Sequence, residues 1–178
     1  TTMVQPKTTV YICNYKKGAV SSKQTLVYNL LNAVLDMVYT ESVREEQGGT
    51  YGVSTTVSVN QLPKPAVYMA IQFQTDSAKV ATLLPIIYDE LGKIAAQSPK
   101  AEHLQRAKEY AKKTYIDQQI NNGYWLNRLV DTQFYGKDNQ ASYLSDLAKI
   151  TAKDIQKAAK ILFSSPNLKE IVQVGVSK

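Results

Sequence analysis

Histidine and cysteine are almost missing from this 178-residue sequence, which contains only His103 and Cys13. One cysteine excludes an intrachain disulfide and a cysteine-based metal cluster. One histidine excludes a two-histidine zinc site built by this chain alone, and it leaves no spare residue for a Ser-His-Asp or Cys-His catalytic set. His103 lies beside Glu102 in the first turns of an expected helix, and we interpret it as a surface residue. The chain alone therefore lacks the metal ligands and the catalytic sets of these enzyme classes.

Several other signals are also lacking. The sequence has neither a G-x-x-x-x-G-K-[ST] loop nor a G-x-G-x-x-G fingerprint, so nothing indicates that it binds nucleotide phosphates. No apolar run approaches the roughly 18 residues of a membrane helix, so no membrane span is expected. The adjacent acidic pairs Glu45-Glu46 and Asp89-Glu90 are poor candidates for a paired-carboxylate hydrolase, because neighbours on a helix point to different sides.

The formal charge of +6 is moderate. Lys149, Lys153, Lys157 and Lys160 recur at helical spacing and form either a basic stripe for an acidic partner or polyanion, or the solvated face of an amphipathic helix. We favour the solvated face. The other basic residues are interspersed with acidic ones, which argues against a nucleic-acid footprint.

The first half of the chain predicts a strand, a helix and a hairpin. Residues Lys7 to Tyr15 are rich in β-branched and aromatic side chains, which favours a strand. From Lys23 to about Gln47 apolar residues recur at spacings of three and four, with Ser21 or Ser22 as N-cap, which predicts a helix with one core-facing stripe. Strict alternation over 51–60 and again over 67–73 predicts an antiparallel hairpin around a proline-marked loop.

The second half is predominantly helical. Asp76 is the expected N-cap of a helix that contains Pro85, which should bend it. Ser98-Pro99 is expected to start the next helix as cap and first residue. After an interruption near Asn121-Asn122-Gly123, the apolar pattern resumes up to Gly136 with these residues: Trp125, Leu126, Leu129, Val130 and Phe134.

The chain then closes with a helix and a strand. Thr151-Ala152-Lys153-Asp154 resembles a capping box that opens a helix to about Phe163, and Leu168 to Val176 is expected to be a final strand. Helices that follow a hairpin predict an α+β domain, with a mostly antiparallel sheet covered by helices on one face. We expect residues 1–178 to form a single domain.

The junction Val43-Arg44-Glu45-Glu46-Gln47-Gly48-Gly49-Thr50-Tyr51-Gly52-Val53 organises the rest of the chain. Gly48-Gly49 is typical of a helix C-terminus, so Arg44 should lie in the last turns of the helix and Tyr51 at the start of the strand. A structural explanation suffices for both residues. The helix dipole favours arginine by roughly 0.3–1 kcal/mol, and tyrosine has a high β-propensity.

These residues carry a family resemblance. The junction is similar to the R-E-x-x-G-x-x-Y segment of the insulinase/pitrilysin family of zinc metallopeptidases, and 102–108 resembles the family's E-L-x-x-A-K helix start. The order of the motifs extends over nearly the whole chain, up to Thr151-Ala152-Lys153-Asp154-Ile155 and the closing strand. The chain thus resembles a C-terminal, non-zinc-binding domain, and in detail it is similar to bacterial periplasmic zinc proteases of the PqqL-like kind.

The resemblance implies an accessory role within a larger multi-domain peptidase. The family holds zinc through an H-x-x-E-H motif in an N-terminal domain, and this sequence lacks that motif. The implied partners are therefore that zinc-binding domain and a peptide substrate, with no cofactor in this chain and no activity of the chain alone. Arg44 and Tyr51 would contact the substrate near the scissile bond as complementing catalytic residues. A periplasmic location is implied only by the resemblance, and its targeting signal would lie outside this fragment.

Two other functions remain open from the sequence. Some members of the family have lost proteolysis, so the domain is alternatively a structural or scaffolding unit. A nucleic-acid-binding α+β module is a further alternative, prompted by the basic charge and the twelve tyrosines. That module ranks last, because the sequence lacks the K/R-G-F/Y-G/A-F-V-x-F/Y strand motif.

Overall fold

The computed structural model describes residues 7–47, 52–136 and 140–175, and for residues 44–47 it describes the backbone alone. The elements in chain order are β1 (Thr8–Lys17), α1 (Ser22–Gln47), β2 (Val53–Asn60), β3 (Ala66–Thr75), the 3-10 helix η1 (Ser77–Lys79), α2 (Val80–Gln97), α3 (Ala101–Gln118), α4 (Asn122–Tyr135), α5 (Tyr143–Lys149), α6 (Ala152–Phe163) and β4 (Lys169–Gln173).

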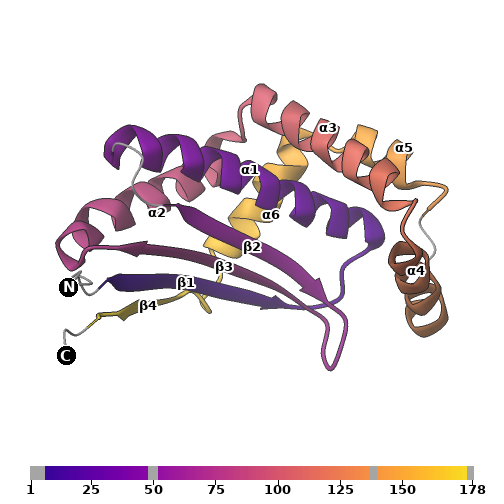
Figure 1. Ribbon diagram of the computed structural model, residues 1–178, viewed down its shortest axis with the longest axis horizontal. Coiled ribbons are helices and arrows are strands. Elements are labelled where there is room, and N and C mark those ends of the chain that lie inside the picture. The colour runs from indigo at the N-terminus through magenta and orange to yellow at the C-terminus, as the bar shows by residue number, and fades with distance from the viewer. Residues whose placement is uncertain (1–6, 48–51, 137–139, 176–178) are drawn as a thin grey trace, which may run out of the picture.

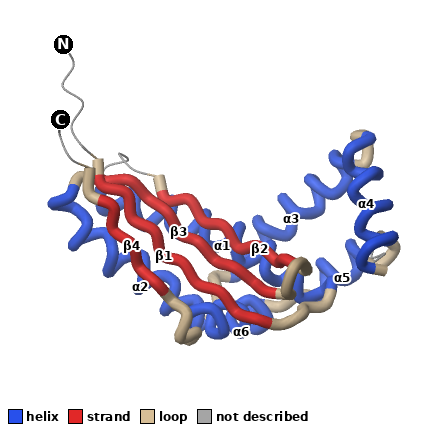
Figure 2. The backbone as a smooth tube through the Cα atoms, turned by 90° about the horizontal axis from the view of Figure 1, so that it is seen from below, coloured by secondary structure: helices blue, strands red, loops and turns tan. Residues whose placement is uncertain are grey.

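The four strands form one antiparallel sheet in the order β2-β3-β1-β4. The predicted hairpin is present, with Val53 opposite Phe73 at one end and Asn60 opposite Ala66 at the other. Figures 1 and 2 show the helices on one face of the sheet, with α3, α4 and α5 extending beyond one end of the strands. The α+β class predicted from the sequence is therefore confirmed.

The core lies between the sheet and helices α1, α2 and α6. The predicted apolar stripe of α1 is buried, because its members recur on the helix face that turns to the sheet. The largest fully buried side chains are Tyr39, Phe73, Ile12, Leu31, Leu35, Met69, Ile71, Leu83, Ile87, Leu91, Ile150 and Ile155. Burying each aliphatic side chain of this kind contributes about 1.5–3 kcal/mol, so this layer dominates the stability of the domain.

Two predicted helix caps have the expected geometry. The Ser21 hydroxyl accepts from the Gln24 N–H at 3.2 Å, and the Gln24 side chain accepts from the Ser21 N–H at 2.8 Å. Thr151 and Asp154 form the predicted capping box at the start of α6. These reciprocal bonds satisfy backbone N–H groups that have no partner inside the helix.

Two other predicted helix starts were wrong. Asp76 caps the short η1 rather than α2, and its side chain makes no capping hydrogen bond. Ser98 ends α2 with a positive φ of 74°, and α3 begins only at Ala101 with Lys100 as N-cap. The chain reverses direction at this point so that α3 packs against α1. The connection therefore contains more residues than the predicted N-cap serine and first-turn proline. Helix α2 continues through Pro85.

The surface also differs from the expectation in one helix. The predicted interruption near residue 121 separates α3 from α4, but the apolar residues of α4 do not enter the core: Leu126, Leu129 and Phe134 are 63%, 68% and 74% exposed. The four lysines of the basic stripe are exposed, as expected of a solvated face. Every helix among the described residues is too short or too polar to span a lipid bilayer.

Candidate functional site at the end of helix α1

The two residues predicted to contact substrate lie at the junction of α1 and β2. The backbone of Arg44 belongs to the last turns of α1, which ends at Gln47, but its side chain is outside the described part of the structure. Tyr51 lies outside the described residues altogether, and β2 begins two residues later at Val53. The roles of Arg44 and Tyr51 therefore stay predictions, and the structure defines their surroundings.

The turns of α1 before Arg44 are fixed against α2. The Tyr39 ring is fully buried, and its hydroxyl donates to the backbone carbonyl of Ile87 in α2 at 3.2 Å. Burial raises the pKa of the Tyr39 phenol far above its ordinary value, so this hydroxyl remains a hydrogen-bond donor. Val43, immediately before Arg44, is 2% exposed. The backbone position of Arg44 is consequently held by the core.

A polar cluster joins the same turns to α3. His103 is 3% exposed, and its Nε2 lies 3.0 Å from Oε2 of Glu41. Arg106 lies 3.7 Å from the other oxygen of Glu41 and 3.8 Å from Glu102. The interpretation of His103 as a surface residue was wrong. Its first-turn position is buried because α3 packs directly across α1.

A small cleft opens beside this cluster. It has a volume of about 230 Å³ and lies between α1, α2 and the start of α3. Glu41, Ser42 and His103 line it, together with Lys93 and Lys100. Arg44 follows Glu41 by three residues, so its backbone lies about one helical turn from a residue that lines this cleft. Both acidic and basic groups are thus available at the corner where Arg44 is located.

The other side of α1 closes the edge of the sheet. The backbone N–H of Thr55 donates to Asp36 at 3.0 Å, and that of Val57 donates to Asn32 at 2.8 Å. Asn32 also donates to Asp36 at 3.0 Å. Strand β2 is the outermost strand, so these side chains occupy backbone groups that would otherwise face outward. An added peptide strand cannot pair with β2 at Thr55 and Val57.

Sequence reasoning missed the roles of Asn32, Asp36 and Glu41. A signal existed for the first two, since two polar residues at i and i+4 occur next to the apolar stripe of α1. Their partners are backbone groups of β2, which the helical spacing cannot identify. Burial raises the pKa of Asp36, although its hydrogen bonds to Thr55 and Asn32 oppose the shift.

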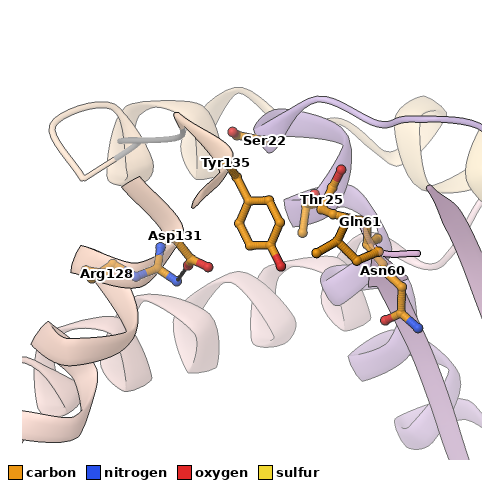
Figure 3. A pocket seen from close by; sticks show the side chains of 9 residues that line it. Ser22, Thr25, Asn60, Gln61, Arg128, Asp131 and Tyr135 are labelled. Carbon is orange, nitrogen blue, oxygen red and sulfur yellow. Dashed lines mark ion pairs between the residues drawn. The ribbon is translucent and has the colours of Figure 1, made fainter. Parts of the chain in front are cut away.

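A second cavity, of about 400 Å³, lies at the opposite end of α1 (Figure 3). It is bounded by Ser22 and Thr25 of α1, by the loop after β2, and by α4. Arg128 and Asp131 of α4 form an ion pair there at 2.6 Å, and Tyr135 lies between them and α1 (Figure 3). The cavity has a mixed lining, with Val59 and Leu62 beside the polar side chains, and it contains no predicted site residue.

The described residues do not fit a zinc ion. No group of three or more histidine, cysteine, aspartate or glutamate side chains is placed to hold a metal in the described part of the chain. His103 already uses its Nε2 on Glu41, and Cys13 lies on β1 of the sheet. A zinc site would require several such side chains to converge on one point.

Comparison with protein families gives a direct match. Residues 2–110 match the model described as "Peptidase M16 inactive domain". The chain belongs to the peptidase M16 family. The matched part of this M16 domain runs from β1 to the middle of α3, and it includes the elements around Arg44, namely α1, α2 and the hairpin of β2 and β3. A search of curated proteins found no matching sequence.

Solved structures share the fold at low sequence identity. The M16 domain superposes on the periplasmic protease PqqL from Escherichia coli with a TM-score of 0.80 and 18% identity, covering 98% of this chain and 19% of that one. The inactive peptidase domain of a putative zinc protease from Bordetella parapertussis gives 0.75 and 15%, covering 98% and 94%. A chain of Complex III2 from Candida albicans gives 0.70 and 11%, covering 96% and 43%. The chain thus spans about a fifth of the length of PqqL.

Proposed function

We propose that this M16 domain completes the peptide-binding chamber of a zinc metalloendopeptidase and presents Arg44 and Tyr51 to a substrate bound at another domain. The observation that carries the proposal is the anchoring of α1 directly before Arg44, through the Tyr39–Ile87 hydrogen bond and the Glu41–His103 contact. A group that must meet a substrate from across a chamber needs a fixed base, because small misplacements cost large factors in rate.

Each residue has a defined chemical task in this proposal. Arg44 keeps its charge at all relevant pH values and can hold a substrate carbonyl through its planar set of donors. Tyr51 donates a hydrogen bond to the carbonyl oxygen, on which negative charge develops during peptide hydrolysis. Donors of this kind contribute about 2.7–4 kcal/mol in enzymes that use them. Neither residue acts until the two halves of the chamber close, which also excludes water.

The partners follow from the same proposal. They are an N-terminal zinc-binding domain of the same polypeptide and an extended peptide substrate. Residues 1–178 then form one domain of a larger peptidase, with zinc held outside this chain. A periplasmic location belongs to this proposal, and the support for it is the fold similarity to the periplasmic protease PqqL.

The deciding experiment replaces Tyr51 with phenylalanine in the full polypeptide. We expect kcat to fall by roughly 10²–10³, with unchanged zinc content, because only the hydroxyl is removed. The matched control is Tyr110→Phe, which removes a hydroxyl from a tyrosine that is 68% exposed on α3 and should leave kcat unchanged. Equal turnover of the Tyr51→Phe variant and the parent protein would remove the catalytic role.

A second candidate is a non-catalytic scaffolding domain. It is favoured by the fold similarity to a chain of Complex III2 and by the apolar surface of α4, both of which suit an assembly role. The two candidates differ in the remainder of the polypeptide: an H-x-x-E-H motif upstream supports the peptidase, and its absence supports the scaffold. A zinc measurement on the purified full polypeptide makes the same distinction.

A further inference from the structure

Helix α4 turns its apolar side to solvent, whereas a normal surface helix turns that side to the core. All fourteen of its residues are described, and none is buried. Leu126, Leu129, Val130 and Phe134 fall on one side of the helix at spacings of three and four, and each is between 42% and 74% exposed. This apolar face contains no charged residue. A helix that faces water on one side normally turns its apolar side inward.

The polar side of α4 is the one that faces the domain. Tyr124, Arg128 and Asp131 are its half-buried residues, and they follow one another at spacings of four and three. The Arg128 guanidinium lies 5.7 Å from the centre of the Tyr124 ring and 2.6 Å from Asp131. The Tyr124 ring packs edge-on against Tyr115 of α3, with centroids 6.3 Å apart. These contacts fix the rotation of α4 and hold its apolar face outward.

A helix of this length needs a partner for that face. Helices shorter than about 12–15 residues are marginal in water without tertiary packing, and α4 obtains little packing from its own domain. Contiguous exposed apolar residues of this kind mark interaction surfaces. Ile120, in the turn before α4, is 87% exposed and adds to the apolar surface at this end of the molecule.

We propose that the apolar face of α4 (Leu126, Leu129, Val130 and Phe134) docks onto another domain of the same longer polypeptide. This inference rests on the proposed function and names the surface through which the domain joins its partner. Two of the matched proteins favour another domain as the partner, since in them this fold is one part of a longer chain: it makes up 19% of the PqqL chain and 43% of the matched Complex III2 chain.

The position and charge of α4 also favour another folded domain as the partner of its apolar face. Figures 1 and 2 show α4 at the outer end of the molecule, projecting beyond the sheet. A projecting helix face inserts into an apolar groove on a folded neighbour, which is the helix-in-groove mode of recognition. The absence of charge on the face disfavours an acidic peptide or a polyanion. The core of a domain interface is depleted of charge in the same way.

The test measures the reactivity of an engineered thiol at Leu129. Leu129→Cys is made in the full polypeptide, and its alkylation rate is followed by peptide mass spectrometry, which separates it from Cys13 and other cysteines. The matched control is Lys157→Cys on α6, an exposed position on the solvated face. We expect the thiol at position 129 to react at least about tenfold more slowly than the control, and equally fast after denaturation.

Each outcome has a definite meaning. Equal rates at 129 and 157 in the folded polypeptide would overturn the proposal. Protection that disappears on dilution would overturn it in favour of a second copy of the chain, and protection only with added peptide would overturn it in favour of substrate. Protection of a monomer without peptide supports it. The catalytic role is scored separately by Tyr51→Phe, so a protected thiol with unimpaired Tyr51→Phe turnover retains the docking surface and removes only the role of Tyr51.

Discussion

Asp36 accepts a hydrogen bond from the backbone N–H of Thr55 at 3.0 Å, and so a helix side chain occupies the outer edge of the sheet. Asn32, four residues earlier on α1, does the same for Val57. An exposed edge strand presents unpaired backbone groups that invite association with other chains. In this domain α1 covers that edge with two side chains one helical turn apart.

Replacing Asp36 with alanine should therefore destabilise the domain. The Thr55 N–H and the side-chain NH2 of Asn32 both lose their acceptor, which we expect to lower the free energy of unfolding by about 1–3 kcal/mol in urea titrations. Asp89→Ala is the matched control, because Asp89 belongs to a solvent-exposed ion pair with Lys93 and its loss should cost less than about 1 kcal/mol. A cost no larger than that of the control would show that water replaces Asp36 at the edge.

The pH dependence of Asp36 has a defined sign. Burial raises the pKa of its carboxyl above the ordinary 3.8, so the folded state binds this proton more tightly than the unfolded state. The contribution of Asp36 to stability is then fully present below pH 3.8 and declines as the pH rises through the folded pKa. The stability difference between the parent protein and Asp36→Asn should shrink as the pH rises across this window. A difference that grows instead would contradict a raised pKa.

The capping box of α6 should show the opposite dependence. Hydrogen bonds from the backbone and hydroxyl of Thr151 hold the pKa of Asp154 below its ordinary 3.8. Its stabilisation is therefore complete above pH 3.8 and is lost as the pH falls through the depressed value. At pH 7 Asp154→Ala should cost about 0.5–2 kcal/mol in thermal or urea unfolding. Asp146→Ala on α5 is the control, and a cost that persisted unchanged at pH 2 would refute the assignment.

The part-buried contact between His103 and Glu41 gives a fourth test. His103→Ala leaves a cavity beside α1, and we expect a loss of about 2–4 kcal/mol in the free energy of unfolding. Glu41→Ala removes the acceptor at 3.0 Å and should cost about 1 kcal/mol. Glu102→Ala is the matched control, since Glu102 also faces Arg106 but both side chains of that pair are exposed. Equal effects of the two glutamate variants would show that the contact with His103 contributes nothing.

The sequence alone determined the local features of this domain. The apolar stripe of α1, the alternation over β2 and β3, and the Thr151–Asp154 box appear in the structure as predicted, because each depends on residues within one or two turns or on strict alternation. The family match over residues 2–110 agrees with the resemblance that the junction at Arg44 and Tyr51 indicated.

Tertiary structure decided the features that depend on which face meets another element. The spacing of Leu126 and Phe134 predicts a stripe but carries no direction, and the ring contacts of Tyr124 turn that stripe outward. His103 is buried only because α3 crosses α1 next to Glu41, which lies 62 residues away in the sequence. The spacing of apolar residues shows only which of them share one side of a helix. Whether that side is buried depends on which element packs against it, and this is decided by packing between segments that are distant in the sequence.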